Sequence, residues 1–100
     1  MPRFDVYANQ GGAGWLLDVQ TDMIYGLETR LVVPLLPTEL VPRLDTRRLN
    51  PAFLLNETPV VMATQYMAAV PSGLLREPAA NLSFEQDRIK AALDMIFLGF

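Results

Sequence analysis

The last eighteen residues of the chain, 83 to 100, carry the clearest pattern of apolar and polar positions. Apolar residues recur there at steps of four, three and four, which places them on one face of a helix at about 100° per residue. They are Ile89, Leu93, Ile96 and Phe100. Ser83 and Gln86 have the spacing of a capping box. The pattern predicts a helix over about residues 84–100, with its charged side chains mostly on the opposite face.

The apolar pattern of this helix changes after Asp94. Residues 95–100 are apolar on every side, and Leu98 projects opposite the stripe that begins at Ile89. A helix that is apolar all round must be buried all round, whereas a chain terminus usually lies at the surface. Either the tip folds back into its own core, or it forms an exposed apolar surface for a partner. We favour the second interpretation.

Before this helix, short segments alternate between apolar and polar residues or are rich in β-branched ones. They predict five or six strands, over residues 3–7, 15–21, 29–35, 52–55, 59–64 and 66–70. Residues 71–80 are interpreted as a linker, and Pro34 and Pro37 place the end of the third strand at an edge or a bulge. We expect a mainly β fold, a small barrel over about residues 1–80, with the C-terminal helix packed on it in one domain of residues 1–100.

The apolar share of the composition is high for a chain of this size. Apolar residues make up 51% of the 100 residues, and a chain of this length buries only a little over ~60% of the surface of its unfolded form. Part of the apolar surface must then remain outside the core. We therefore expect a homodimer or a docking protein rather than a lone monomer.

Candidate catalytic residues are few. The chain has no histidine and no cysteine, which removes the usual acid–base group at neutral pH, thiolate chemistry and the commonest metal ligand. Asp18 and Asp22 lie four residues apart and could do acid–base work, but an aspartate at a strand end more often caps a turn. We expect no enzymatic activity, no cofactor and no metal.

The charge of the chain disfavours nucleic acid as a direct partner. The net charge is −3 and the sequence pI is about 4.7, which disfavours sequence-specific nucleic-acid binding by this chain alone, because basic residues supply most of that affinity. No secretion signal follows the start, and no apolar run is long enough to span a membrane. We expect a cytoplasmic protein without membrane contact.

Several stretches keep the order and spacing of one known family over nearly the whole chain. They are residues 4–7 (FDVY), 17–24 (LDVQTDMI), 30–35 (RLVVPL), 67–71 (MAAVP), 81–83 (NLS) and 89–100 (IKAALDMIFLGF). In these stretches the chain resembles CcdB, the toxin of plasmid-borne toxin–antitoxin pairs that poisons DNA gyrase.

The resemblance implies a fold and a mode of action. CcdB proteins have a small SH3-like β-barrel with a long C-terminal helix, and they form homodimers. The ends of the two helices bind the dimerisation domain of the gyrase A subunit and trap gyrase on cleaved DNA, while the toxin itself catalyses nothing. A CcdA-like antitoxin wraps the toxin with a disordered segment and extracts it from gyrase.

By position, the resemblance implies a gyrase-binding surface. Its members would be Met23, Ile24, Asp94, Phe97, Leu98, Gly99 and Phe100. This chain has Leu98 where the family typically has tryptophan, and its loop after Tyr7 is shorter and less basic than the family's usual loop.

Two alternatives to a gyrase poison stay open. One is a relative with the toxin fold that binds an antitoxin without poisoning gyrase. The other is an endoribonuclease of the MazF/Kid kind, against which the missing histidine and the acidic balance count.

Overall fold

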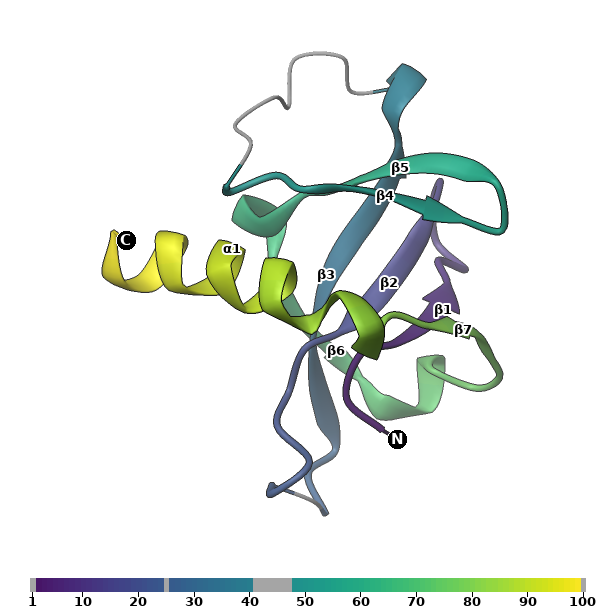
Figure 1. Cartoon of the computed structure of the whole chain (residues 1–100). Coiled ribbons are helices and arrows are strands. Elements are labelled where there is room, and N and C mark those ends of the chain that lie inside the picture. Colours follow the sequence, from purple (N-terminus) through teal and green to yellow (C-terminus); the bar gives the residue numbers. More distant parts are fainter. Residues whose placement is uncertain (1, 25, 41–47, 100) are drawn as a thin grey trace.

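The structure is a computed structural model that describes residues 2–24, 26–40 and 48–99. Its main elements, in chain order, are β1 (Asp5–Ala8), β2 (Trp15–Asp18), β3 (Thr29–Pro37), β4 (Ala52–Leu55), β5 (Thr58–Met62), β6 (Ala68–Pro71), β7 (Pro78–Asn81) and α1 (Gln86–Leu98). Short 3₁₀ turns lie at Thr38–Leu40, Thr64–Tyr66, Ser72–Leu74 and Ser83–Glu85. Figure 1 shows the strands curled into a half-barrel, with α1 crossing it and its C-terminal end extending beyond the sheet.

The nine-residue strand β3 is the central strand of the sheet and pairs with β2, β5 and β6. Its neighbours give the strand order β4-β5-β3-β2-β1-β7, and β6 pairs with β3 alone. The first half of β3, from Thr29 to Val32, pairs with β6, and the last part, from Leu35 to Pro37, pairs with β5. All these pairings are antiparallel. The expected fold class is confirmed: a mainly β chain with one C-terminal helix, in keeping with a small SH3-like barrel.

Pro34 lies where β3 changes partner. It falls between the two paired halves, has no N–H to donate, and its carbonyl accepts from the N–H of Ala63 (2.9 Å). A proline therefore fits inside this strand without breaking a pair. The sequence prediction placed the end of the strand near this residue, but β3 continues to Pro37.

Alternating side chains of the strands build the core. In β4, Phe53 and Leu55 are buried while Ala52 and Leu54 are exposed, as a period of two requires. The main cluster includes Phe4, Val6, Leu17, Val33, Leu35, Phe53, Leu55, Val60, Met62, Leu82, Ile89, Ala92 and Leu93. Helix and sheet thus share one core, so α1 is held to the half-barrel by burial of apolar surface.

The approach to α1 differs from the predicted capping box. The backbone N–H of Ser83 donates to Oδ1 of Asn81 (2.8 Å), and residues Ser83–Glu85 form a 3₁₀ turn before the helix begins at Gln86. The residue at the helix N-cap, Glu85, makes no side-chain capping bond, so the capping-box prediction is wrong. Asn81 also donates from Nδ2 to Oδ1 of Asp5 (2.8 Å), which ties the start of the helix to β1.

The predicted linker over residues 71–80 is also wrong in part. It contains a 3₁₀ turn and most of β7, which pairs with β1 at one edge of the sheet, with Asp5 opposite Asn81 and Tyr7 opposite Pro78. The strand predicted over residues 52–55 has the expected ends, and the remaining predicted strands are found with shifted ends. The first two begin later or end earlier than predicted, and the third is longer.

Candidate functional site

The end of α1 is the most exposed apolar part of the helix. The exposed fraction is 37% for Ile96, 66% for Phe97 and 59% for Leu98, whereas Ile89 and Ala92 are fully buried. We call residues 96–99 the helix tip. The tip does not fold back into the core of its own chain, so the alternative of a buried tip is wrong for these residues. Phe100, the last member of the predicted surface, lies outside the described residues.

Gly99 ends the helix at the tip. Its φ is 81°, and its N–H donates to the carbonyl of Met95 (3.1 Å). This left-handed conformation, which favours glycine, closes the helix and turns the chain at that point. The predicted site residues Phe97, Leu98 and Gly99 therefore lie together on one exposed surface.

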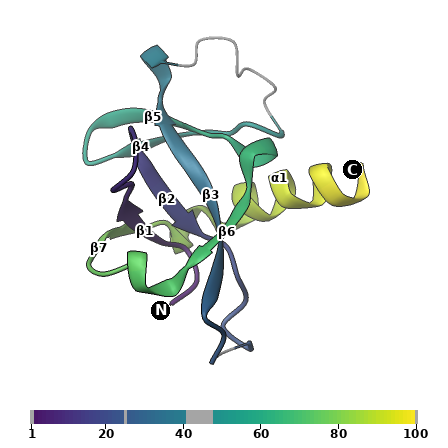
Figure 2. The same cartoon turned by 180° about the vertical axis from the view of Figure 1, so that it is seen from behind.

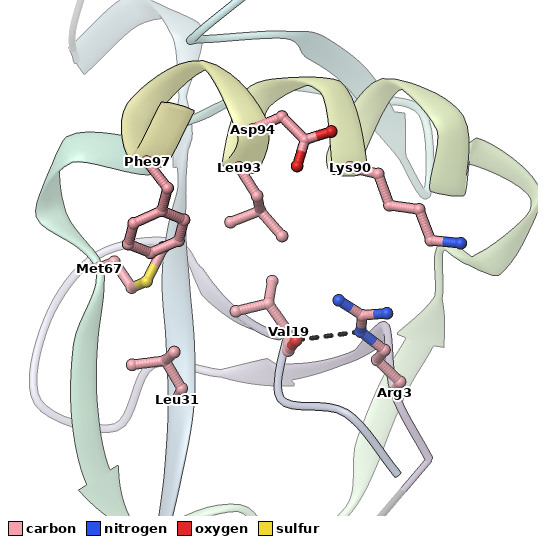
Figure 3. A pocket seen from close by; sticks show the side chains of 8 residues that line it. All are labelled: Arg3, Val19, Leu31, Met67, Lys90, Leu93, Asp94 and Phe97. Atoms are coloured by element: carbon pink, nitrogen blue, oxygen red, sulfur yellow. Dashed lines mark hydrogen bonds between the residues drawn. The ribbon is translucent and has the colours of Figure 1, made fainter. Parts of the chain in front are cut away.

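A groove of about 250 Å³ separates α1 from the sheet next to the tip. Its floor and walls are mostly apolar, formed by Val19, Leu31, Met67, Leu93 and Phe97. Charged side chains stand around them, namely Arg3, Lys90 and Asp94. Figure 3 shows Phe97 beside Met67 at one end of the groove and Arg3 at the other. The structure thus brings Asp94 and Phe97, two of the predicted site residues, to a single concave surface that suits an apolar segment of a partner.

Met23 and Ile24 lie on a separate surface. They belong to the loop between β2 and β3, where the exposed fraction is 88% for Met23 and 47% for Ile24. In Figures 1 and 2 this loop and the helix tip leave the sheet in different directions. Within one chain, the structure therefore does not join these two residues to the other members of the predicted surface.

A buried ion pair stands at the base of this loop. Nη2 of Arg30 lies 2.7 Å from Oδ2 of Asp18, and Nε of Arg30 donates to the same oxygen (2.9 Å). The side chain of Asp18 is fully buried and that of Arg30 is 9% exposed. Burial raises the pKa of the Asp18 carboxyl above its ordinary value, and the bonds from Arg30 oppose that rise.

Asp18 also performs the role predicted for it. Its Oδ1 accepts from the backbone N–H of Gln20 (3.1 Å), which is a turn cap at a strand end. Sequence analysis missed the partner, Arg30. The sequence does show Arg30 as a lone charged residue inside an apolar strand, which can indicate a buried ion pair. Its partner becomes evident only from the pairing of β2 with β3, which brings the ends of the loop together.

Arg3 was also missed. Its backbone N–H donates to Oδ1 of Asp22 (2.8 Å), and its Nε donates to the carbonyl of Val19 (3.0 Å; Figure 3). Its guanidinium carbon stands 4.8 Å from the centre of the Phe4 ring. Arg3 therefore connects the N-terminal segment to the loop and, through its side chain, to the groove.

Within the described ranges, no group of three or more acidic, histidine or cysteine side chains is placed to hold a metal ion. In the same part of the chain, no helix is both long and apolar enough to cross a bilayer.

A comparison with known protein families gives one match of nearly full length. The family model of the CcdB protein matches residues 3–99 of this 100-residue chain. The matched range spans the strands that the structure describes, the groove and the helix tip through Gly99. The chain therefore belongs to the CcdB family, the toxins of toxin–antitoxin systems.

Proposed function

We propose that this protein binds the A subunit of DNA gyrase through the helix tip and traps gyrase on cleaved DNA. The observation that carries the proposal is the exposure of Phe97 and Leu98, at 66% and 59%, on a helix whose earlier apolar side chains Ile89, Ala92 and Leu93 are buried. A monomer has no structural use for two large apolar side chains held in water. Their place matches the surface by which, according to the resemblance, CcdB proteins bind gyrase.

The chemistry of the tip suits protein recognition. A few side chains near the centre of an interface contribute most of its affinity when a partner encloses them. Asp94, one turn before Leu98 on the exposed surface of α1, adds a charge that can fix the orientation of the partner. We assign the contact to Asp94, Phe97, Leu98 and Gly99, with Phe100 following in the sequence.

The loop that carries Met23 and Ile24 forms a second contact in this proposal. Because it leaves the sheet away from the tip, a single partner surface reaches both only if it is large or if two copies of the toxin act together. We infer a homodimer, supported by the open apolar groove with Val19, Leu31 and Met67 on its floor. A CcdA-like antitoxin is the second macromolecular partner, as membership of the family implies.

The affinity for the isolated dimerisation domain of the gyrase A subunit tests the proposal. We expect that Phe97→Ser and Leu98→Ser each weaken binding by tenfold or more, because the loss of an enclosed anchor often costs ~2 kcal/mol. Leu54→Ser is the matched control, since Leu54 is 70% exposed but lies on β4, away from the tip. Absence of binding by the natural protein, or equal weakening by Leu54→Ser, would contradict the proposal.

A second candidate function is supported by one residue. Leu98 replaces the tryptophan that the family typically carries, and leucine offers less contact area and no N–H donor. A toxin-fold protein that binds its antitoxin but no longer poisons gyrase is therefore the alternative. It predicts tight binding of an antitoxin peptide together with no binding of the gyrase domain.

A further inference from the structure

The loop between β2 and β3 begins and ends in a network of buried polar contacts. Asp18, the last residue of β2, and Arg30, the second residue of β3, form the ion pair described above, at 2.7 Å. Nη2 of Arg30 also donates to the carbonyl of Gln20 (3.5 Å), and Oε1 of Gln20 accepts from the N–H of Leu31 (3.1 Å). Both ends of the loop are therefore joined to each other by side chains as well as by the sheet.

A second set of contacts holds the middle of the loop. Asp22, which directly precedes Met23, accepts at Oδ1 from the backbone N–H of Arg3 (2.8 Å). The same oxygen lies 4.0 Å from Nη2 of Arg30. Asp22 thus stands between two positively polarised groups from different segments. The N–H of Met23 donates to Oγ1 of Thr21 (3.3 Å), which sets the turn that follows.

The polar network holds a loop whose apolar side chains stay exposed to solvent. An exposed methionine lowers its free energy by folding back onto nearby apolar surface, yet Met23 is 88% exposed. A buried ion pair adds little stability over an apolar pair, because both charges lose water on burial. Such a pair does fix geometry, since its bonds are directional and a misplaced partner leaves a buried charge unpaired.

We propose that the Asp18–Arg30 pair, with Asp22 and Arg3, positions Met23 and Ile24 for the target, holding the loop in its binding conformation before contact. This inference rests on the proposed function. Order in the free state raises affinity because less conformational freedom is lost on binding. These four residues are thus positioning residues, and the loop's apolar side chains are the ones that touch the partner.

A double-mutant cycle with the isolated dimerisation domain of the gyrase A subunit tests the inference. Asp22→Ala removes the acceptor for Arg3, and its side chain is 59% exposed, so the variant should remain folded. We expect Asp22→Ala to weaken binding three- to tenfold in the natural protein and by less than twofold when Met23→Ala is already present. Combined with Phe97→Ala on the tip, its effect should be additive. If Asp22→Ala weakens binding equally in the natural protein and in Met23→Ala, Asp22 has only a structural role and the inference is overturned. An affinity that Asp22→Ala leaves unchanged would also overturn it.

Amide hydrogen exchange of the free protein separates this inference from the proposed function. We expect Arg30→Lys and Asp22→Ala each to speed exchange at the amides of Met23 and Ile24 by tenfold or more. Arg30→Lys keeps the positive charge but loses the paired contacts of Nε and Nη2 with Asp18. Exchange in β5 should stay unchanged. Unaltered loop exchange overturns the positioning role even if gyrase binds. Faster exchange in a protein that does not bind the gyrase domain would support an ordered loop and reject gyrase as its target.

Discussion

Leu93 and Phe97 lie one helical turn apart on α1 and line the same groove, yet 8% of Leu93 is exposed against 66% of Phe97. Leu93 is the last buried residue of α1. Figure 1 shows that the C-terminal end of the helix extends beyond the sheet. In the proposed function, the turn with Leu93 stabilises the fold and the next turn, with Phe97, contacts the partner. Substitutions should therefore separate stability from binding.

The two turns of α1 should respond differently to alanine. Leu93→Ala removes a buried side chain and should lower the free energy of unfolding by about 2–5 kcal/mol. Leu98→Ala removes an exposed one and should change it by less than about 0.5 kcal/mol. Urea unfolding of both variants measures the difference. If Leu98→Ala destabilises the protein as much as Leu93→Ala, the tip belongs to the core.

Two glycines with the same backbone conformation should differ in the cost of an added methyl group. Gly14 and Gly99 have φ values of 79° and 81°. A Cβ at Gly14 would clash with the carbonyl oxygen of Leu35, while one at Gly99 would meet no atom of the described residues within 4 Å beyond its chain neighbours and its own helix. Gly99→Ala should cost about 1 kcal/mol, from backbone strain alone. Gly14→Ala should cost more than about 2 kcal/mol, since β3 must also move. Thermal unfolding of the pair checks this order, and equal costs would contradict the close approach at Gly14.

Tyr7 should make the fold sensitive to alkali. Burial, with the Asp5 and Asp18 carboxylates nearby, raises the pKa of the Tyr7 hydroxyl above its ordinary value of 10.0. The folded state therefore keeps a proton that the unfolded state loses, so stability from this residue is present below pH 10 and falls as the pH rises through the folded-state pKa. Urea unfolding between pH 8 and about 11 should show a shallower decline for Tyr7→Phe. Parallel profiles for the two proteins would exclude Tyr7 as the cause.

The homodimer can be tested at the groove. Met67→Glu places a charge on its apolar floor and should shift the protein towards monomer in sedimentation equilibrium at micromolar concentration, because a buried unpaired charge is costly. Leu54→Glu, on the exposed side of β4, is the control and should leave the dimer intact. A natural protein that sediments as a monomer throughout would remove the homodimer from this interpretation.

The helix and most strands could be predicted from the sequence because their apolar residues repeat with the period of the element. Ile89, Ala92 and Leu93 are buried as the helical spacing requires, and Phe53 and Leu55 as the strand spacing requires. The exposed tip followed from the same reasoning, since residues 95–98 are apolar on sides that one core cannot cover.

The strand β7 could not be predicted in this way. Its sequence, Pro-Ala-Ala-Asn, has none of the β-branched or aromatic residues that favour a strand. It is extended because β1, more than seventy residues earlier, offers an edge for pairing. The start of α1 was mispredicted for a related reason: Asn81, fixed by Asp5 of β1, and not Ser83, organises the turn before the helix.

The candidate site was predicted only where it depends on residues that are close in sequence. Phe97, Leu98 and Gly99 are consecutive and lie together, whereas the support of the loop by Arg30 and Arg3 comes from long-range contacts. Asp18 and Arg30 are twelve residues apart. Nothing in their local sequence shows that the register of β2 and β3, which pairs Asp18 with Val32, brings the side chain of Arg30 within reach of Asp18.

Gyrase-mediated DNA cleavage tests the central claim, that the tip of α1 is a gyrase-binding surface, most directly. Purified gyrase and supercoiled plasmid are incubated with the natural protein, Leu98→Trp or Phe97→Ala, and the linear DNA released by detergent and protease is measured. We predict linear DNA with the natural protein and at least tenfold less with Phe97→Ala. Leu98→Trp should release more linear DNA than the natural protein, because tryptophan offers a larger contact area to the partner. Linear DNA that is equally abundant with all three proteins, or absent with all three, would contradict the claim.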